Sequence, residues 1–137
     1  MKESISLSWL SEMSFEADIN GHKVYLDASP DHGGKNMGPR PKPFMLLALG
    51  GCTGMDVVSI LGKMRVEFDS LNIRVEGNLT EEHPKHFDNM KVIYEFSGKG
   101  LSMDKLQKAV DLSKERYCGV SANYRESMDL EYEVRII

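Results

Sequence analysis

The chain has 137 residues and a formal net charge of −4, and 41% of its residues are hydrophobic. This length predicts a single domain, residues 1–137, with a core of its own. The negative net charge argues against a nucleic-acid partner, which would need a basic surface. Residues 1–6 lack the apolar run of a signal peptide, so we expect a cytoplasmic location. Nine methionines are many for this length, and we interpret them as adaptable core filling rather than as a binding surface.

Residues 4–28 are predicted to form a small antiparallel meander. Apolar and polar residues alternate over 15–19 and again over 23–28, which is the period of a half-buried strand. Asn20-Gly21 lies between these two runs and is the strongest short-range signal of a hairpin. An earlier strand over Ser4 to Trp9 would complete the meander.

Residues 29–43 are predicted to form a loop, and a solvated connector is favoured over a functional loop. Prolines at 39, 41 and 43 hold its second half extended, because each disfavours helix at the residue before it. Pro43 is then suited to be the first residue of a helix.

Residues 44–64 are apolar on nearly every face, and Asp56 is the only charged residue before Lys63. A helix of this kind belongs in a core or a membrane, and its length would just span a bilayer. We reject the membrane, because Asp56 lies near the middle and polar strands flank the segment. One small layer of strands cannot cover such a helix on every side. The segment therefore predicts an obligate homodimer built around this helix.

The second half of the chain alternates strands and helices. Strands are predicted within 66–98, interrupted by a polar turn over 80–86. Ser102 is a predicted cap for a helix over 103–117, followed by a break or a short second helix over 118–123. Alternation over 129–136 predicts a final strand with two distinct faces. The helix over 103–117 is predicted to bury one face, formed by Leu106, Ala109, Val110 and Tyr117.

Two cysteines are the candidate functional residues. A pair so far apart in sequence cannot by itself build a metal cluster. It is also poorly suited to form a structural disulfide in a reducing compartment. The pair suits redox chemistry, in which one thiolate attacks an oxidant and the other closes a disulfide. Such chemistry requires the two sulfurs to meet, with Cα atoms within about 7 Å. Taken alone, each residue is better explained as a buried core thiol. The two are Cys52, flanked by glycines at 50, 51 and 54, and Cys118, at the break after the predicted helix.

A reactive thiolate at Cys52 would need a nearby cation, because a position inside a helix gains nothing from the helix dipole. Arg40, Arg116 and Arg125 are the candidates. His83 and His86 are separated by a proline in a polar turn, and no metal site is expected there. The sequence shows no Ser-His-Asp arrangement, phosphate-binding glycine loop or nucleotide fingerprint.

The segments Gly38 to Leu61 and Ala109 to Ala122 place both cysteines in contexts that resemble the OsmC/Ohr family of osmotically induced and organic-hydroperoxide-resistance proteins. The likeness covers nearly the whole chain and is closest to the YhfA-like branch of the family. It implies an α+β fold in which antiparallel sheets wrap around long central helices in an intertwined homodimer. Two active sites would lie at the subunit interface.

The resemblance also implies thiol peroxidase chemistry on organic hydroperoxides. Cys52 would be the peroxidatic thiolate, and Cys118 would be the resolving thiol. An external dithiol would reduce their disulfide, with no metal or organic cofactor, because sulfur is the redox centre.

Two activating residues of the family peroxidases are missing from their usual places. A glutamate at the helix entry aligns with Pro43 here, and no arginine precedes Arg40. Arg40 or Arg125 is the candidate replacement. This departure leaves two alternatives to the peroxidase. One is a non-catalytic homodimer that binds small apolar or thiol-bearing ligands in the interface pocket. The other is a redox sensor that uses the same cysteine pair.

Overall fold

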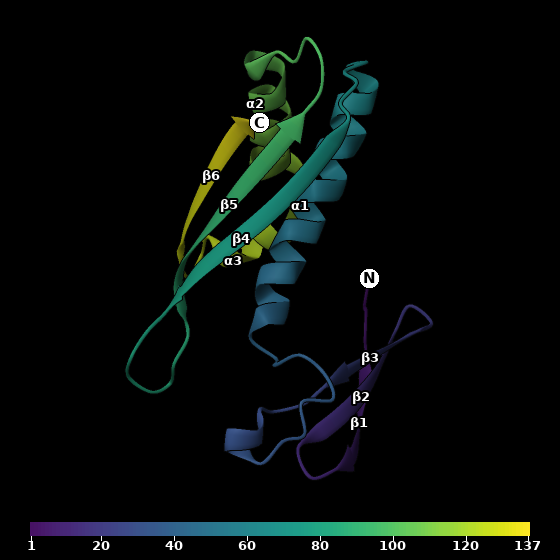
Figure 1. Ribbon diagram of the computed structural model, residues 1–137, viewed down its shortest axis with the longest axis vertical. Coiled ribbons are helices and arrows are strands. Elements are labelled where there is room, and N and C mark those ends of the chain that lie inside the picture. The colour runs from purple at the N-terminus through teal and green to yellow at the C-terminus, as the bar shows by residue number, and fades with distance from the viewer. The chain divides into compact units, whose positions relative to one another are not determined.

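The computed structural model describes residues 1–137, which form two compact units, Met1–Met45 and Leu46–Ile137 (Figure 1). Each unit contains one three-stranded sheet. That both units act as a single domain stays a prediction.

The first unit is built on the predicted meander of β1 (Ser6–Ser11), β2 (Ser14–Ile19) and β3 (His22–Leu26). The strands pair antiparallel in the order β1-β2-β3. Asn20 and Gly21 have φ values of 51° and 82°, the two positive values that a type I′ hairpin turn requires. The predicted hairpin is thereby confirmed. His22, which lies between the two predicted strands, begins β3 and pairs with Ile19.

The loop after β3 folds around the buried carboxylate of Asp27, which is only 4% exposed. Its oxygens accept hydrogen bonds from the backbone amides of Ala28 (2.7 Å), Lys35 (3.1 Å) and Met37 (3.1 Å). Burial alone would raise the pKa of this carboxyl, but the three amides outweigh it and lower the pKa. The loop also contains the short helix η1 (Pro30–His32). It is therefore an organised segment, and its role as a connector stays a prediction.

The second unit contains the sheet β4 (Ser70–Leu79), β5 (Phe87–Ser97) and β6 (Asp129–Ile136), in the order β4-β5-β6. β4 pairs antiparallel with β5, whereas β6 runs parallel to β5. A parallel neighbour requires a long crossover connection, which the helices between β5 and β6 provide. The strands were predicted from their alternation, but the expectation of antiparallel sheets is wrong for β6, because the helical crossover returns the chain parallel to β5.

The central strand β5 supplies most of the core of this unit, and Figure 1 shows it between β4 and β6. Met90, Val92, Tyr94 and Phe96 are buried on the face that the helices cover. Ile93 points to the opposite face, where it pairs with Arg74 on one side and Glu133 on the other. It is nevertheless only 1% exposed, as expected where long charged side chains lie over an apolar neighbour.

Helix α1 (Pro43–Lys63) begins at Pro43 as predicted. Its buried side chains form one stripe at every fourth residue, namely Leu49, Thr53, Val57 and Leu61. Other apolar side chains of α1 are exposed, including Leu47 at 65%, Met55 at 78% and Val58 at 48%. The helix is also long and apolar enough to cross a membrane, by length and composition alone. Its own unit thus covers only one side of it.

The segment between β5 and β6 is not one continuous α-helix. Ser102 caps α2 (Met103–Leu112) by accepting a hydrogen bond from the amide of Lys105 (3.4 Å). The next residues form a π-helix, η2 (Ser113–Tyr117), before the short α3 (Gly119–Tyr124). Because a π turn holds more residues than an α turn, the predicted α-helical face does not extend to Tyr117. Leu106, Ala109 and Val110 are buried as predicted, but Tyr117 is 58% exposed.

The interpretation of the methionines as core filling is wrong for several of them. Met90 is buried at 1% exposure, but Met37, Met55 and Met103 are 70%, 78% and 42% exposed. Met55 in particular lies on the uncovered side of α1, where the second unit offers no packing partner.

Candidate functional site

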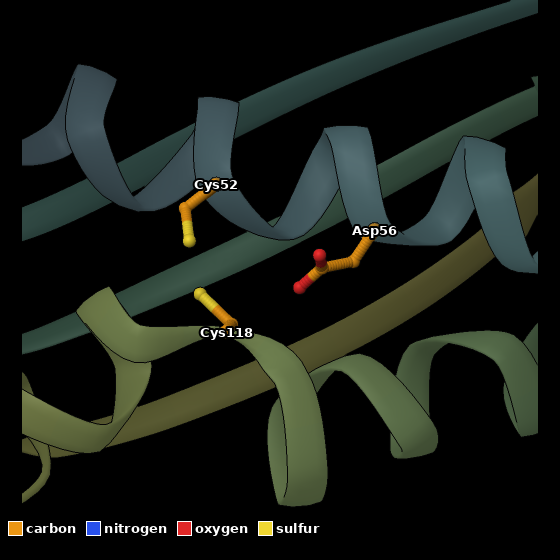
Figure 2. A group of neighbouring side chains, drawn as sticks. All are labelled: Cys52, Asp56 and Cys118. Atoms are coloured by element: carbon orange, nitrogen blue, oxygen red, sulfur yellow. The ribbon is translucent and has the colours of Figure 1, made fainter.

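The second unit brings Cys52, Asp56 and Cys118 together (Figure 2). The two sulfurs and a carboxylate oxygen all lie within 4.8 Å of one another. Cys52 and Asp56 lie one turn apart on α1, so both point to the same side of the helix. Cys118 comes from the junction between η2 and α3, and Figure 2 shows its sulfur pointing toward that of Cys52. Neither cysteine is in a disulfide.

The π-helix η2 determines where Cys118 lies. The amide of Cys118 donates to the carbonyl of Ser113, five residues earlier, at 2.8 Å. At Cys118 the backbone becomes extended, with φ −76° and ψ 101°, and the side chain caps α3. Its sulfur accepts a hydrogen bond from the amide of Ser121 at 3.3 Å. The predicted break and the predicted short helix are both present, and Cys118 is the residue that joins them.

Asp56 is held by a chain of buried hydroxyl groups. Thr53 Oγ1 shares hydrogen bonds with Tyr94 Oη (2.6 Å) and with Ser113 Oγ (2.8 Å). Ser113 Oγ in turn donates to Asp56 Oδ2 at 3.0 Å. Ser113 therefore fixes the carboxylate through its side chain and the amide of Cys118 through its carbonyl oxygen. Thr53 and Ser113 are fully buried, so the hydroxyl groups of this network are shielded from water.

The surroundings of Cys52 favour the protonated thiol. Burial is the largest effect and raises its pKa; the amide of Val120 acts in the opposite direction. The neighbouring Cys118 thiol and the negative charge of Asp56 raise the pKa further. The two neighbouring groups, Cys118 and Asp56, therefore both oppose the ionisation of Cys52.

Two of the three candidate arginines belong to this unit, and both are engaged elsewhere. The Arg116 guanidinium lies 6.0 Å from the ring centroid of Tyr117. Arg125 Nη1 donates to the carbonyl of Lys114 at 2.9 Å. The third candidate, Arg40, belongs to the first unit, where Nη1 donates to Asn36 Oδ1 at 2.8 Å and to Gly38 O at 3.0 Å. In the second unit, no cation is among the groups that shift the Cys52 pKa.

A cavity of about 400 Å³ lies against Asp56. Apolar side chains and the lysines Lys63 and Lys108 form part of its wall. Neither lysine forms an ion pair with Asp56. The cavity is lined by Asp56, Ser59, Ile60, Lys63, Met64, Lys108, Leu112 and Tyr117.

Sequence reasoning identified both cysteines but missed the residues that hold them. Asp56 was noticed only as a charge that argues against a membrane. Its isolation in an apolar helix was the available signal, because a lone carboxylate in a packed helix needs a partner. Ser113 and Thr53 gave no such signal. His83 and His86, which were not expected to bind a metal, lie in the turn between β4 and β5, where His86 Nδ1 contacts the carbonyl of Pro84 at 2.6 Å.

The α+β fold and its close pair of free cysteines place the chain among thiol-containing proteins. Comparison with known families identifies the family. The model of the family described as OsmC-like protein matches residues 33–133. The chain belongs to the OsmC family. The predicted α+β, OsmC-like fold is confirmed.

Individual relatives match over almost the whole chain. Protein YhfA of Escherichia coli (strain K12) is 28% identical over 132 residues, which is 96% of each chain. The crystal structure of a hypothetical protein from Aquifex aeolicus VF5 has a TM-score of 0.87 at 28% identity, covering 100% of this chain and 97% of that one. An organic hydroperoxide resistance protein OsmC from Legionella pneumophila has a TM-score of 0.73 at 15% identity and covers 98% and 97%. The last likeness shows the fold alone.

Proposed function

We propose that this protein is a cysteine-based thiol peroxidase that reduces organic hydroperoxides, with Cys52 as the peroxidatic residue and Cys118 as the resolving residue. The observation that supports it is the approach of the two sulfurs to within 4.8 Å. Membership of the OsmC family and the close cysteine pair support a redox or oxidative-stress role. The peroxidase is the specific form of that role that we propose.

The reaction has two steps at the cysteines. The Cys52 thiol loses its proton, and the thiolate attacks the terminal oxygen of the peroxide, so that the O–O bond breaks and that oxygen with its hydrogen stays on sulfur as a sulfenic acid. The alkoxide takes up the proton that the thiol released and leaves as the alcohol. The Cys118 thiol then attacks that sulfur and expels water, which forms the Cys52–Cys118 disulfide. A dithiol from outside the protein reduces the disulfide by exchange. No group other than sulfur and the peroxide oxygens changes its oxidation state.

Burial supports the assignment of roles. Cys52 is partly exposed, whereas Cys118 is only 3% exposed. A peroxide therefore reaches Cys52 first. Cys118 lies at an extended junction between two helical segments, where small changes in backbone angles would let its sulfur close the bond.

The proposed assembly is a cytoplasmic homodimer without a nucleic-acid or membrane partner. Its partners are a small organic hydroperoxide and an external dithiol reductant. The exposed apolar side of α1, which includes Leu47 and Met55, supports the dimer, since an apolar surface of this kind marks an interaction site.

The test is intact mass with peptide mapping of the reduced protein, before and after one equivalent of cumene hydroperoxide, with hydrogen peroxide in parallel. We expect a loss of two hydrogens per chain, mapped to a Cys52–Cys118 bridge, and faster with the organic peroxide. The matched variants are Cys52→Ser, which abolishes peroxide consumption, and Cys118→Ser, which stops at a sulfenic acid that a dimedone probe captures. Undiminished peroxide consumption by Cys52→Ser contradicts the proposal.

The raised pKa of Cys52 favours one alternative, a redox sensor that is oxidised slowly and stoichiometrically. A protonated thiol is a poor nucleophile, which suits a disulfide that forms once and alters a partner contact. Multiple turnovers with excess peroxide and dithiol support the enzyme. A single oxidation per chain under the same conditions supports the sensor.

A further inference from the structure

Cys52, Asp56 and Cys118 form a cluster of potential metal ligands, although the sequence by itself predicted no metal site for the cysteine pair. Two thiols and one carboxylate place three acidic groups within 4.8 Å. The arginines of this unit that the sequence suggested as partners are engaged with Tyr117 and with a backbone carbonyl. A bound cation would instead provide a positive charge at this cluster that stabilises both thiolates.

We propose that the reduced protein binds Zn²⁺ through Cys52 Sγ, Cys118 Sγ and a carboxylate oxygen of Asp56, with water as the fourth ligand. Three protein ligands and one open position are typical of zinc sites that exchange ligands, whereas closed structural sites use four. The site lies wholly within Leu46–Ile137, and so does not depend on the first unit.

The donor set selects the metal. Thiolates exclude Mg²⁺ and Ca²⁺, which prefer oxygen ligands alone. A carboxylate is a poor ligand for Cu⁺, which prefers sulfur. Zn²⁺ accepts both kinds of donor at one centre. The mixed set of two sulfurs and one oxygen therefore favours Zn²⁺ over these competitors.

The observed spacing is close to what tetrahedral zinc requires. Zn–S bonds of about 2.3 Å and Zn–O bonds of about 2.1 Å place the donor atoms roughly 3.5–3.8 Å apart. The three donors lie within 4.8 Å, so a contraction of about 1 Å at most completes the site. Cys118 can supply it, because its backbone is extended between η2 and α3.

Second-sphere contacts already orient the ligands. Ser113 Oγ donates to Asp56 Oδ2 at 3.0 Å, and the amide of Ser121 donates to Cys118 Sγ at 3.3 Å. Contacts of this kind hold ligands in place at metal sites. Thr53 extends the support by its hydrogen bond to Ser113.

Binding converts both thiols to thiolates, so one Zn²⁺ enters and two protons leave. The affinity therefore rises with pH. A Cys52–Cys118 disulfide consumes both sulfur ligands, so zinc and the disulfide exclude each other. This competition follows from the shared sulfurs and does not require the protein to turn over peroxide.

The experiment is a zinc titration of the reduced, chelator-treated protein in competition with a chromophoric chelator, with Co²⁺ as a spectroscopic probe. We expect one Zn²⁺ per chain, two protons released, and thiolate-to-cobalt charge-transfer absorption with tetrahedral d–d bands. Oxidation to the disulfide should abolish the binding. Absence of binding to the reduced wild-type protein overturns the proposal without any variant.

The variants separate this site from surface binding. Cys52→Ser and Cys118→Ser should each weaken zinc binding by at least about 100-fold, and Asp56→Asn by about 10-fold or more. The matched control is Asp31→Asn, which removes an exposed carboxylate of the first unit and should leave the affinity unchanged. Equal loss in the control, or no loss in Asp56→Asn, overturns the assignment. Peroxide consumption by a protein that does not bind zinc refutes this inference alone, and zinc binding without peroxide consumption refutes the peroxidase alone.

Discussion

At the scale of single residues, the protonation state of the Cys52 thiol determines how reactive the site is. Burial, Cys118 and Asp56 all raise the pKa of its thiol, and only the amide of Val120 acts against them. A thiol with a raised pKa is protonated at neutral pH. Its reactivity therefore increases as the pH rises through and beyond the ordinary thiol value of about 8.5.

The first residue-scale prediction concerns this pH dependence. The rate at which iodoacetamide alkylates Cys52 in the isolated protein should still be rising where an ordinary thiol has reached its plateau. Asp56→Asn removes a negative charge and should shift the profile to lower pH. The measurement is the alkylation rate of the Cys52 peptide against pH, by mass spectrometry. A plateau reached at neutral pH would mean that a cation activates Cys52 after all.

At the scale of elements, α1 can approach β4 closely because it contains glycines on the side that faces the strand. A Cβ at Gly50 would lie 2.9 Å from Val75 Cγ2, which is closer than ordinary van der Waals contact. Valine is stiff at χ1, so the strand cannot yield easily. Gly62, in the last turn of the same helix, would meet nothing within 4 Å.

Replacing each of these two glycines by alanine gives a matched pair of variants. Gly62→Ala should stabilise the protein by up to about 1 kcal/mol, through helix propensity alone. Gly50→Ala gains the same propensity but must displace Val75, and overpacking typically costs about 1–3 kcal/mol. We therefore expect Gly50→Ala to be the less stable variant in urea unfolding. A gain in Gly50→Ala equal to that in Gly62→Ala would show that α1 and β4 pack less closely than described.

The junction from η2 to α3 is the second element that matters for the site. The hydrogen bond from the Cys118 amide to Ser113 spans five residues, and this wider turn brings Cys118 opposite Cys52. Because π turns occur often at functional sites, the change of helix type is consistent with a site at Cys118. An α-helix continued through Tyr117 would place Cys118 elsewhere on the helix circumference.

At the scale of the whole molecule, each unit leaves apolar surface uncovered. In the second unit, Leu47, Met55 and Val58 of α1 are exposed. In the first unit, one face of the meander lines an apolar cavity of about 420 Å³, and Leu7 and Phe15 are among the residues that line it. The proposed homodimer would cover such surfaces.

The prediction at this scale is a homodimer. Analytical ultracentrifugation should give twice the chain mass of 15.5 kDa. Met55→Glu places a charge on the uncovered side of α1, where Met55 is 78% exposed, and should shift the protein toward monomer. Lys99→Glu, at the exposed turn before α2, is the control and should leave the mass unchanged. A wild-type protein that sediments as a monomer at all concentrations contradicts the dimer.

The sequence by itself determined most of the elements, because their signals are local. Alternation predicted the strands, Asn20-Gly21 predicted the hairpin, Pro43 predicted the start of α1, and Ser102 predicted the start of α2. The two cysteines and the segments around them were sufficient to indicate the family. Each of these signals depends on residues that are neighbours along the chain.

Only the tertiary structure decided how those elements meet. The parallel pairing of β6 with β5, the π-helix before Cys118 and the convergence of Asp56 with both sulfurs depend on contacts between residues far apart in sequence. Ser113 shows why such contacts escape prediction: it contacts Asp56 and Thr53, more than fifty positions away. A serine in a helix carries no sign of such distant partners, since its local pattern is the same whether or not they are present. The sequence therefore identified the two candidate cysteines, and long-range packing determined their geometry and their surroundings.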